Sequence, residues 1–175
     1  MVITVSDFIG DIVLNDPDVV PGYQSIINQV EDKYLRMLLG NEQYQQLYDE
    51  YLVDGADTTT DNYDKWDKFI NGERYSYNNT FITFEGAKNF LKYFCWVELI
   101  NKTDFTSGND IYRQEVTSGK RVEGIERKEL INDNYNKGVF HYRRAYYYMY
   151  NNSQKFDITY FVNLNYKRGF SGITL

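Results

Sequence analysis

The sequence has one cysteine, one histidine and two prolines in 175 residues. A single cysteine cannot form an internal disulfide, and Cys95 falls within an apolar segment, which predicts a packed thiol rather than a nucleophile. His141 stands beside large aromatic residues, and no serine or cysteine is placed to make a recognisable triad with it. We therefore expect an ordinary hydrophobic core and no enzymatic activity.

Long hydrophobic runs are also absent. The longest apolar segment, residues 86–100, is shorter than the roughly 18 apolar residues of a membrane span and contains two charges, so no membrane contact is expected. No charged segment followed by an apolar one opens the chain, and secretion is therefore not expected.

Basic residues are outnumbered by acidic ones, 19 to 25, which gives a formal net charge of -6 and argues against a general nucleic-acid binder. The charge is uneven, because residues 1–112 hold 8 Lys+Arg and 19 Asp+Glu, whereas residues 113–175 hold 11 and 6. An acidic and a basic surface on one chain suit head-to-tail contacts between copies. Two ordinary solvated faces would give the same charge pattern.

Aromatic residues are abundant, with Tyr 18 and Phe 11. Tyrosine is enriched in protein interfaces, which favours a binding or assembly role. A host proteome rich in tyrosine is the alternative explanation.

Residues 86–100, GAKNFLKYFCWVELI, are apolar around the whole circumference of a helix. Between Phe90 and Ile100 only Lys92 and Glu98 interrupt the hydrophobic residues, and such a helix must be covered by other elements. We therefore expect a mainly α fold, a helical bundle around this buried central helix.

Helical signals also occur on the N-terminal side. Ser6 is a plausible cap for a short helix over residues 7–14. Apolar residues at spacings of three and four predict a second helix over residues 23–39, which Gly40 ends, and Asn41 caps the next helical segment.

The stretch before the central helix is acidic and then aromatic. The calcium-loop order is absent from residues 54–64, although their aspartates, Asp57, Asp61 and Asp64, are the clustered candidates that an enzyme would use. Trp66 belongs to one apolar helical turn, and residues 73–84 are predicted to be extended.

The longest periodic run, residues 123–152, predicts a long helix. Gly138 lies inside it, which indicates a close packing contact or a slight bend. Arg143 and Arg144 are assigned to the helix end, where cations suit the helix dipole, rather than to phosphate binding.

Two segments are expected to be extended. Residues 103–124 form an arm in the helical domain, 1–155, and residues 156–175 form a C-terminal tail with strand-like alternation at 160–165. An apolar tail either folds back on its own subunit or docks on a partner, and its aromatic residues favour the partner. The candidate subunit-interface residues of the arm are Arg113, Lys120 and Arg121, and the candidate partner anchors of the tail are Phe156, Tyr160, Phe161 and Phe170.

Three stretches taken in order carry a family resemblance: KYLRMLLGNEQYQQLYDEY (33–51), GAKNFLKYFCWVELINKTDFTSGNDIYRQEV (86–116) and NDNYNKGVFHYRRAYYYMYNNSQKF (132–156). In this order the chain resembles the small helical head-tail connector, or adaptor, proteins of tailed bacteriophages, especially those infecting Bacteroidetes. The likeness covers most of the chain and rests on element order and loose motifs.

The resemblance implies a structural virion protein without cofactor or metal. Such adaptors form a ring, typically of twelve copies, that contacts the portal protein and other tail or ring proteins at the head-tail junction after assembly in the host cytoplasm. DNA would pass through the lumen without specific binding, and an acidic lumen would repel it. The alternative is a small helical protein-binding or regulatory module that forms no ring.

Overall fold

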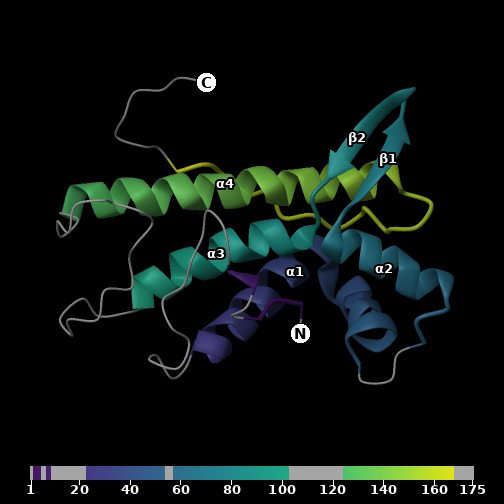
Figure 1. The fold of residues 1–175 in the computed structure, drawn as a ribbon, viewed down its shortest axis with the longest axis horizontal. Coiled ribbons are helices and arrows are strands. Elements are labelled where there is room, and N and C mark those ends of the chain that lie inside the picture. Colours follow the sequence, from purple (N-terminus) through teal and green to yellow (C-terminus); the bar gives the residue numbers. More distant parts are fainter. Residues whose placement is uncertain (1, 5–6, 9–22, 54–56, 103–123, 168–175) are drawn as a thin grey trace.

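The structure, a computed structural model, describes residues 2–4, 7–8, 23–53, 57–102 and 124–167. In these ranges the chain is mainly helical, as predicted, and it contains one small two-stranded sheet (Figure 1). The elements are α1 (Tyr23–Leu47), the π-helical turn η2 (Tyr48–Leu52), α2 (Asp61–Asn71), β1 (Glu73–Tyr77), β2 (Thr80–Phe84), α3 (Ala87–Lys102) and α4 (Gly124–Asn151). The expected cap Ser6 and most of the expected first helix lie outside the described residues.

The first long helix is interrupted where the sequence predicts. α1 consists of two helical segments that join at Gly40, whose φ of 72° and ψ of 172° are not helical. Residues with a side chain rarely adopt this φ, so glycine ends the first segment at low cost. The chain resumes at Asn41 and continues through η2, which packs on α2.

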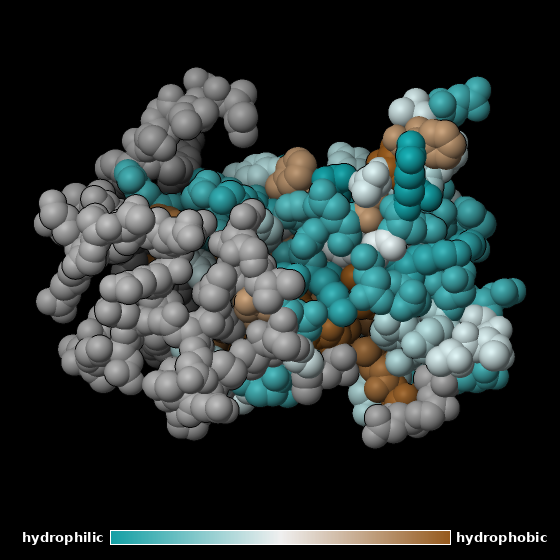
Figure 2. All heavy atoms as spheres, in the orientation of Figure 1, coloured by the Kyte–Doolittle hydropathy of each residue, from teal (hydrophilic) through white to brown (hydrophobic). Residues whose placement is uncertain are grey.

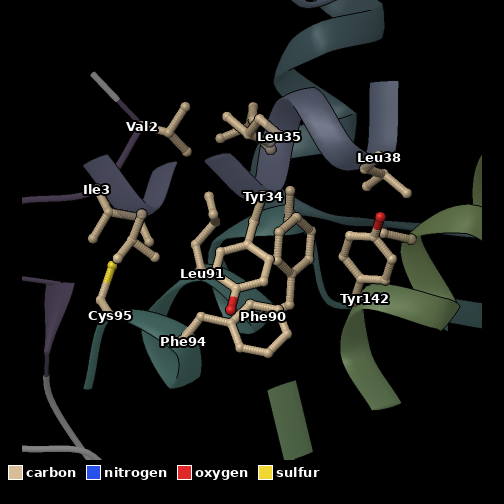
Figure 3. Packing of buried hydrophobic residues seen from close by; sticks show 14 of the residues in the cluster. Val2, Ile3, Tyr34, Leu35, Leu38, Phe90, Leu91, Phe94, Cys95 and Tyr142 are labelled. Atoms are coloured by element: carbon tan, nitrogen blue, oxygen red, sulfur yellow. The ribbon is translucent and has the colours of Figure 1, made fainter. Parts of the chain in front are cut away.

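α3 lies between α1 and α4 in Figure 1 and also packs on α2. Figure 3 shows its side chains among those of α1, α4 and the N-terminal segment. The ring of Phe94 stacks on Tyr34 of α1 with 3.9 Å between the ring centroids. Cys95 is fully buried, and burial raises the pKa of its thiol, so the predicted packed thiol is confirmed. None of the described helices has the length and apolarity to span a bilayer.

The N-terminal segment is held by a buried carboxylate. The main-chain N–H groups of Val2 and Ile3 donate to Glu31 Oε2 at 2.8 and 3.1 Å. Burial raises the pKa of Glu31, while these two donors oppose the rise. Val2 and Ile3 thereby enter the core beside α1 and α3 (Figure 3).

The predicted extended stretch is an antiparallel hairpin of β1 and β2, in which Tyr75 lies opposite Ile82 and Ser76 opposite Phe81. Its turn residues, Asn78 and Asn79, have φ values of 49° and 60°. Asparagine tolerates this left-handed conformation, and two such residues in sequence make the tight turn that hairpins favour. The hairpin projects beyond α4 (Figure 1).

α3 and α4 approach closely at Gly138. A Cβ at this position would lie 2.7 Å from Cε1 of Phe94, closer than real contacts allow. The predicted close packing contact is therefore confirmed, and the absence of a side chain lets the two helices meet against a fully buried ring.

We expect the substitution Gly138→Ala to lower the free energy of unfolding by about 1–3 kcal/mol, because the added methyl group overpacks the contact with Phe94. Helix propensity alone would stabilise the alanine variant by about 1 kcal/mol. The sign of the change in unfolding free energy therefore shows whether overpacking or helix propensity dominates. Urea unfolding of the purified chain measures it, and Phe94→Leu in the same chain should recover part of the loss. A stabilised Gly138→Ala variant would contradict the close contact.

Candidate functional site

Of the predicted arm, residues 103–124, all but Gly124 lie outside the described residues, and Gly124 is the first residue of α4. Its candidate interface residues, Arg113, Lys120 and Arg121, thus lie outside the described residues, as does Phe170 of the tail. The described candidate residues are the other three tail aromatics, Phe156, Tyr160 and Phe161.

Phe156 is a core residue and not a surface anchor, because its side chain is only 3% exposed. Its ring lies 5.6 Å from that of Trp66, 5.7 Å from Phe69 and 5.8 Å from Tyr148, measured between centroids. The chain turns back directly after α4, where the main-chain N–H of Phe156 donates to the carbonyl of Asn152 at 3.3 Å. This turn carries the aromatic ring into the core rather than toward a partner.

Residues 157–167 fold back along α4, which is the first of the two alternatives for the tail. Two side-chain amides bind the main chain at the ends of this segment. Gln43 Oε1 accepts from the N–H of Asp157 at 3.0 Å, and Asn136 binds both the N–H and the carbonyl of Lys167, at 2.8 and 2.9 Å. Because each amide offers a donor and an acceptor, it pairs with the main chain as a neighbouring strand would.

Between these ends, the segment is extended without forming a strand, so the predicted strand at 160–165 is wrong. The N–H of Val162 donates to the carbonyl of Met37 at 3.2 Å, and the Val162 carbonyl accepts from the hydroxyl of Tyr142 at 3.0 Å. Side chains and one α1 carbonyl provide these partners, and no β ladder is present among the described tail residues.

The tail aromatics differ in accessibility. Phe161 stacks on Tyr146 of α4 with 3.9 Å between centroids and is partly buried. Tyr160 is exposed at its outer side and covers the helix break at Gly40. Of the described tail candidates, Tyr160 is thus the one that a partner can reach.

Arg143 and Arg144 are too far from the C-terminal end of α4, at Asn151, to interact with the helix dipole there. Arg143 Nη2 donates to the carbonyl of Leu164 at 2.8 Å and so holds the tail. Arg144 donates to the carbonyl of Thr83 and pairs with Glu85 at 3.4 Å. These long-range contacts replace the predicted dipole role.

The acidic residues before and within α2 make local contacts. Asp57 Oδ1 accepts from the N–H and the hydroxyl of Thr59 at 2.9 and 2.7 Å, and these bonds lower the pKa of Asp57. Asp64 pairs with Lys68 at 2.6 Å, and Asp61 lies in the first turn of α2, where the helix dipole favours a carboxylate. In the described part of the chain, no three His, Cys, Asp or Glu side chains are grouped to hold a metal ion.

A groove of about 620 Å³ separates the hairpin from the C-terminal half of α4, and we name it the hairpin groove. The pattern of alternation places one face of the hairpin toward α4, where Phe84 stacks on Tyr148 with 4.3 Å between centroids. The hydroxyl of Tyr148 also donates to Glu73 Oε1 at 2.6 Å, which fixes the base of the hairpin. The groove is lined mainly by Tyr75, Tyr77 and Ile82 of the hairpin and by Tyr146, Tyr147 and Tyr150 of α4.

Several aromatic side chains of the hairpin and of α4 are exposed. Tyr147 is 61% exposed and Tyr150 51%, while Phe81 on the hairpin is 69% exposed. The guanidinium carbon of Arg74 lies 4.6 Å from the centroid of the Phe81 ring. Figure 2 shows hydrophobic atoms on the projecting part of the hairpin, next to hydrophilic ones.

The chemistry of the hairpin groove is that of a binding surface. Tyrosine rings offer apolar faces for stacking, and their hydroxyl groups donate and accept hydrogen bonds. Burial raises the pKa of the neighbouring Tyr148, so its phenol stays protonated and is no base. Sequence reasoning missed this site, although the Asn-Asn turn and the tyrosine run at 146–148 were usable signals.

Comparisons with protein-family models, with curated proteins and with solved structures find no match to this chain. Function must therefore be argued from the residues and their arrangement.

His141 belongs to the contacts that attach the hairpin to the helices. Its Nδ1 lies 3.1 Å from Glu85 Oε2, and its ring stacks on Tyr93 with 5.6 Å between centroids. Burial lowers the pKa of His141, while Glu85 acts in the opposite direction and Arg144 adds to the lowering. The histidine thus has a structural role.

We expect the His141 imidazole to titrate below its ordinary pKa of about 6.5 in an NMR experiment, where the single histidine gives an unambiguous signal. With a lowered folded-state pKa, the His141 imidazole binds a proton more readily in the unfolded chain than in the folded one. Neutral His141 therefore makes its full contribution to stability above about pH 6.5. This contribution is lost as the pH falls through the folded-state pKa. His141→Gln should remove that part of the pH dependence, and Glu85→Gln should lower the pKa further. A midpoint above 6.5 would show that Glu85 outweighs burial.

Proposed function

We propose that the chain is a structural virion protein that forms a ring adaptor between the portal vertex and the tail of a tailed bacteriophage. The resemblance to head-tail connectors suggests this role. In the proposal, α3 is the central helix of a helical bundle that acts as a rigid scaffold, and the surface elements make the contacts. The observation that carries the proposal is the gathering of exposed aromatic side chains on the hairpin and the C-terminal half of α4.

Exposed aromatic residues of this kind favour a protein interface over solvent. Phe81, Tyr147 and Tyr150 lie on two adjoining elements rather than being scattered singly. Aromatic side chains bury much surface at a small loss of conformational entropy, which is why binding energy concentrates on them. Asp57 accepts hydrogen bonds from Thr59 and Asp64 pairs with Lys68, and such local contacts suit an assembly role better than catalysis.

The distribution of charge supports contacts between unlike surfaces. The net charge is -11 over residues 1–112 and +5 over residues 113–175. A head-to-tail contact that repeats around a rotation axis closes into a ring without leaving an unpaired surface. In such a ring the acidic excess would let DNA pass without being gripped.

Because the tail folds back on its own subunit, fewer of its residues are available to contact the portal. Phe156 and the main chain of residues 157–167 stabilise the subunit itself, so we assign the portal contact to the exposed side chain of Tyr160 and to residues 168–175, which include Phe170. Removing the whole of 156–175 would delete a core side chain and disturb the domain. A chain that ends after Lys167 keeps every described tail contact and makes the cleaner test.

The alternative is a monomeric helical module that binds a partner protein without forming a ring. The hairpin groove on a single subunit suits that role equally well. The two proposals differ in mass and in appearance by electron microscopy.

When the chain is mixed with the portal protein of its virion, we expect negative-stain microscopy to show rings on the portal. Light scattering should show that the portal gains roughly 250 kDa, the mass of about twelve copies of the 20.8 kDa chain. The chain alone is measured in parallel, because assembly can require the portal. The variant that ends after Lys167 should fold normally and bind the portal at least tenfold more weakly. A 20.8 kDa species with and without the portal would contradict the connector role and favour the monomeric module.

A further inference from the structure

Phe81 and the hairpin groove lie on opposite faces of the same two-stranded sheet. In the register, Ser76 lies opposite Phe81, whereas Tyr75 lies opposite Ile82. Since neighbouring residues of a strand point to opposite faces, Phe81 points away from the face that lines the groove. The sheet itself therefore separates Phe81 from the groove of its own subunit.

The side chains around Phe81 form a small projecting unit. Arg74 places its guanidinium carbon 4.6 Å from the Phe81 ring, on the face of the hairpin that does not line the groove. An aromatic ring with an arginine beside it is a combination that protein interfaces use as an anchor.

The hairpin groove has the size and the chemistry to receive this unit. Its volume of about 620 Å³ exceeds that of one aromatic side chain and a guanidinium group. Tyrosine rings in the wall attract a cation through their faces and stack with a phenyl ring. The cation in the wall, Arg144, is paired with Glu85, which lessens its repulsion of Arg74.

We propose that the hairpin of one copy docks in the hairpin groove of a second copy, with Phe81 and Arg74 as the inserted side chains. A second copy is the occupant because a projecting aromatic unit and a matching groove occur on one chain and cannot meet within it. This inference deepens the ring-forming function proposed above and rests on it for the closure of the contact into a ring.

The geometry of this contact is head-to-tail. Each copy contributes its hairpin tip to one neighbour and its groove to the other, so the two surfaces in contact are different. A contact of this kind propagates around a ring, whereas a two-fold contact would stop at a dimer. Each subunit then has its Phe81, Tyr147 and Tyr150 covered at once.

The first test replaces Phe81 with the photo-crosslinking residue benzoylphenylalanine in the full chain. Unlabelled chains that carry the crosslinker are mixed at millimolar concentration with ¹⁵N-labelled chains, so that mass spectrometry separates contacts between chains from those within one. We expect crosslinks between chains to the segment 146–151. The same replacement at Phe140, an exposed aromatic outside the groove lining, should give none there. No crosslink between chains, or crosslinks to other segments, would overturn the inference.

The second test uses paired variants of the two surfaces. Phe81→Ala and the double substitution Tyr147→Ala, Tyr150→Ala should each weaken self-association at least tenfold in analytical ultracentrifugation. Phe140→Ala and Tyr48→Ala, which remove exposed aromatic rings elsewhere, should not. An equimolar mixture of the two deficient variants should restore one contact and give 1:1 pairs, because each supplies the surface that the other lacks.

The outcomes separate this contact from the connector function. Rings on the portal that form equally well from the Phe81→Ala chain would overturn the contact and leave the connector role intact. Crosslinks at the groove in a chain that never forms rings would overturn the connector role and leave the contact intact. Full self-association by both deficient variants alone would overturn the head-to-tail contact.

Discussion

The close approach of α3 and α4 at Phe94 and Gly138 is the constraint on which the other described elements depend. Phe94 also stacks on Tyr34 of α1 and is fully buried, and both restrict the movement of its ring. Because Gly138 has no side chain, α4 can lie directly on the core, in agreement with the dense packing of protein interiors. The position of α4 then determines where both of its attached segments lie.

α4 holds two other segments of the chain in place. Asn136, Tyr142 and Arg143 bind the returning tail, and Arg144 and Tyr148 bind the hairpin. The tail contacts satisfy main-chain groups that would otherwise face the helix without partners, which accounts for an ordered segment that has no regular structure. Tyr75, in the middle of β1, also contacts Tyr148 and Asn151 of α4, while Phe81 near the turn of the hairpin stays exposed.

Much of the helical framework was predictable, whereas the surface that we assign to function was not. Residues such as Gly40, Gly138 and Cys95 act through local geometry or burial, which spacing along the chain reveals. The burial of Phe156 and the contact of Arg143 with Leu164 depend on where the chain turns after α4. Helical periodicity carries no information about that turn. The hairpin groove combines Tyr75, Tyr77 and Ile82 with Tyr146, Tyr147 and Tyr150. The Asn-Asn turn and the tyrosine run mark each stretch separately, but neither stretch shows that the two pair in space.

The central claim is that the hairpin and the C-terminal half of α4 become covered when copies of the chain assemble. Hydroxyl-radical footprinting measures the solvent accessibility of aromatic side chains directly, in dilute chain and in assembled particles. We expect the oxidation of Phe81, Tyr147 and Tyr150 to fall several-fold on assembly, with Tyr48 and Phe140 unchanged as internal controls. Protection of Tyr48 or Phe140 in place of these three residues, or oxidation that assembly leaves unaltered, would contradict the claim.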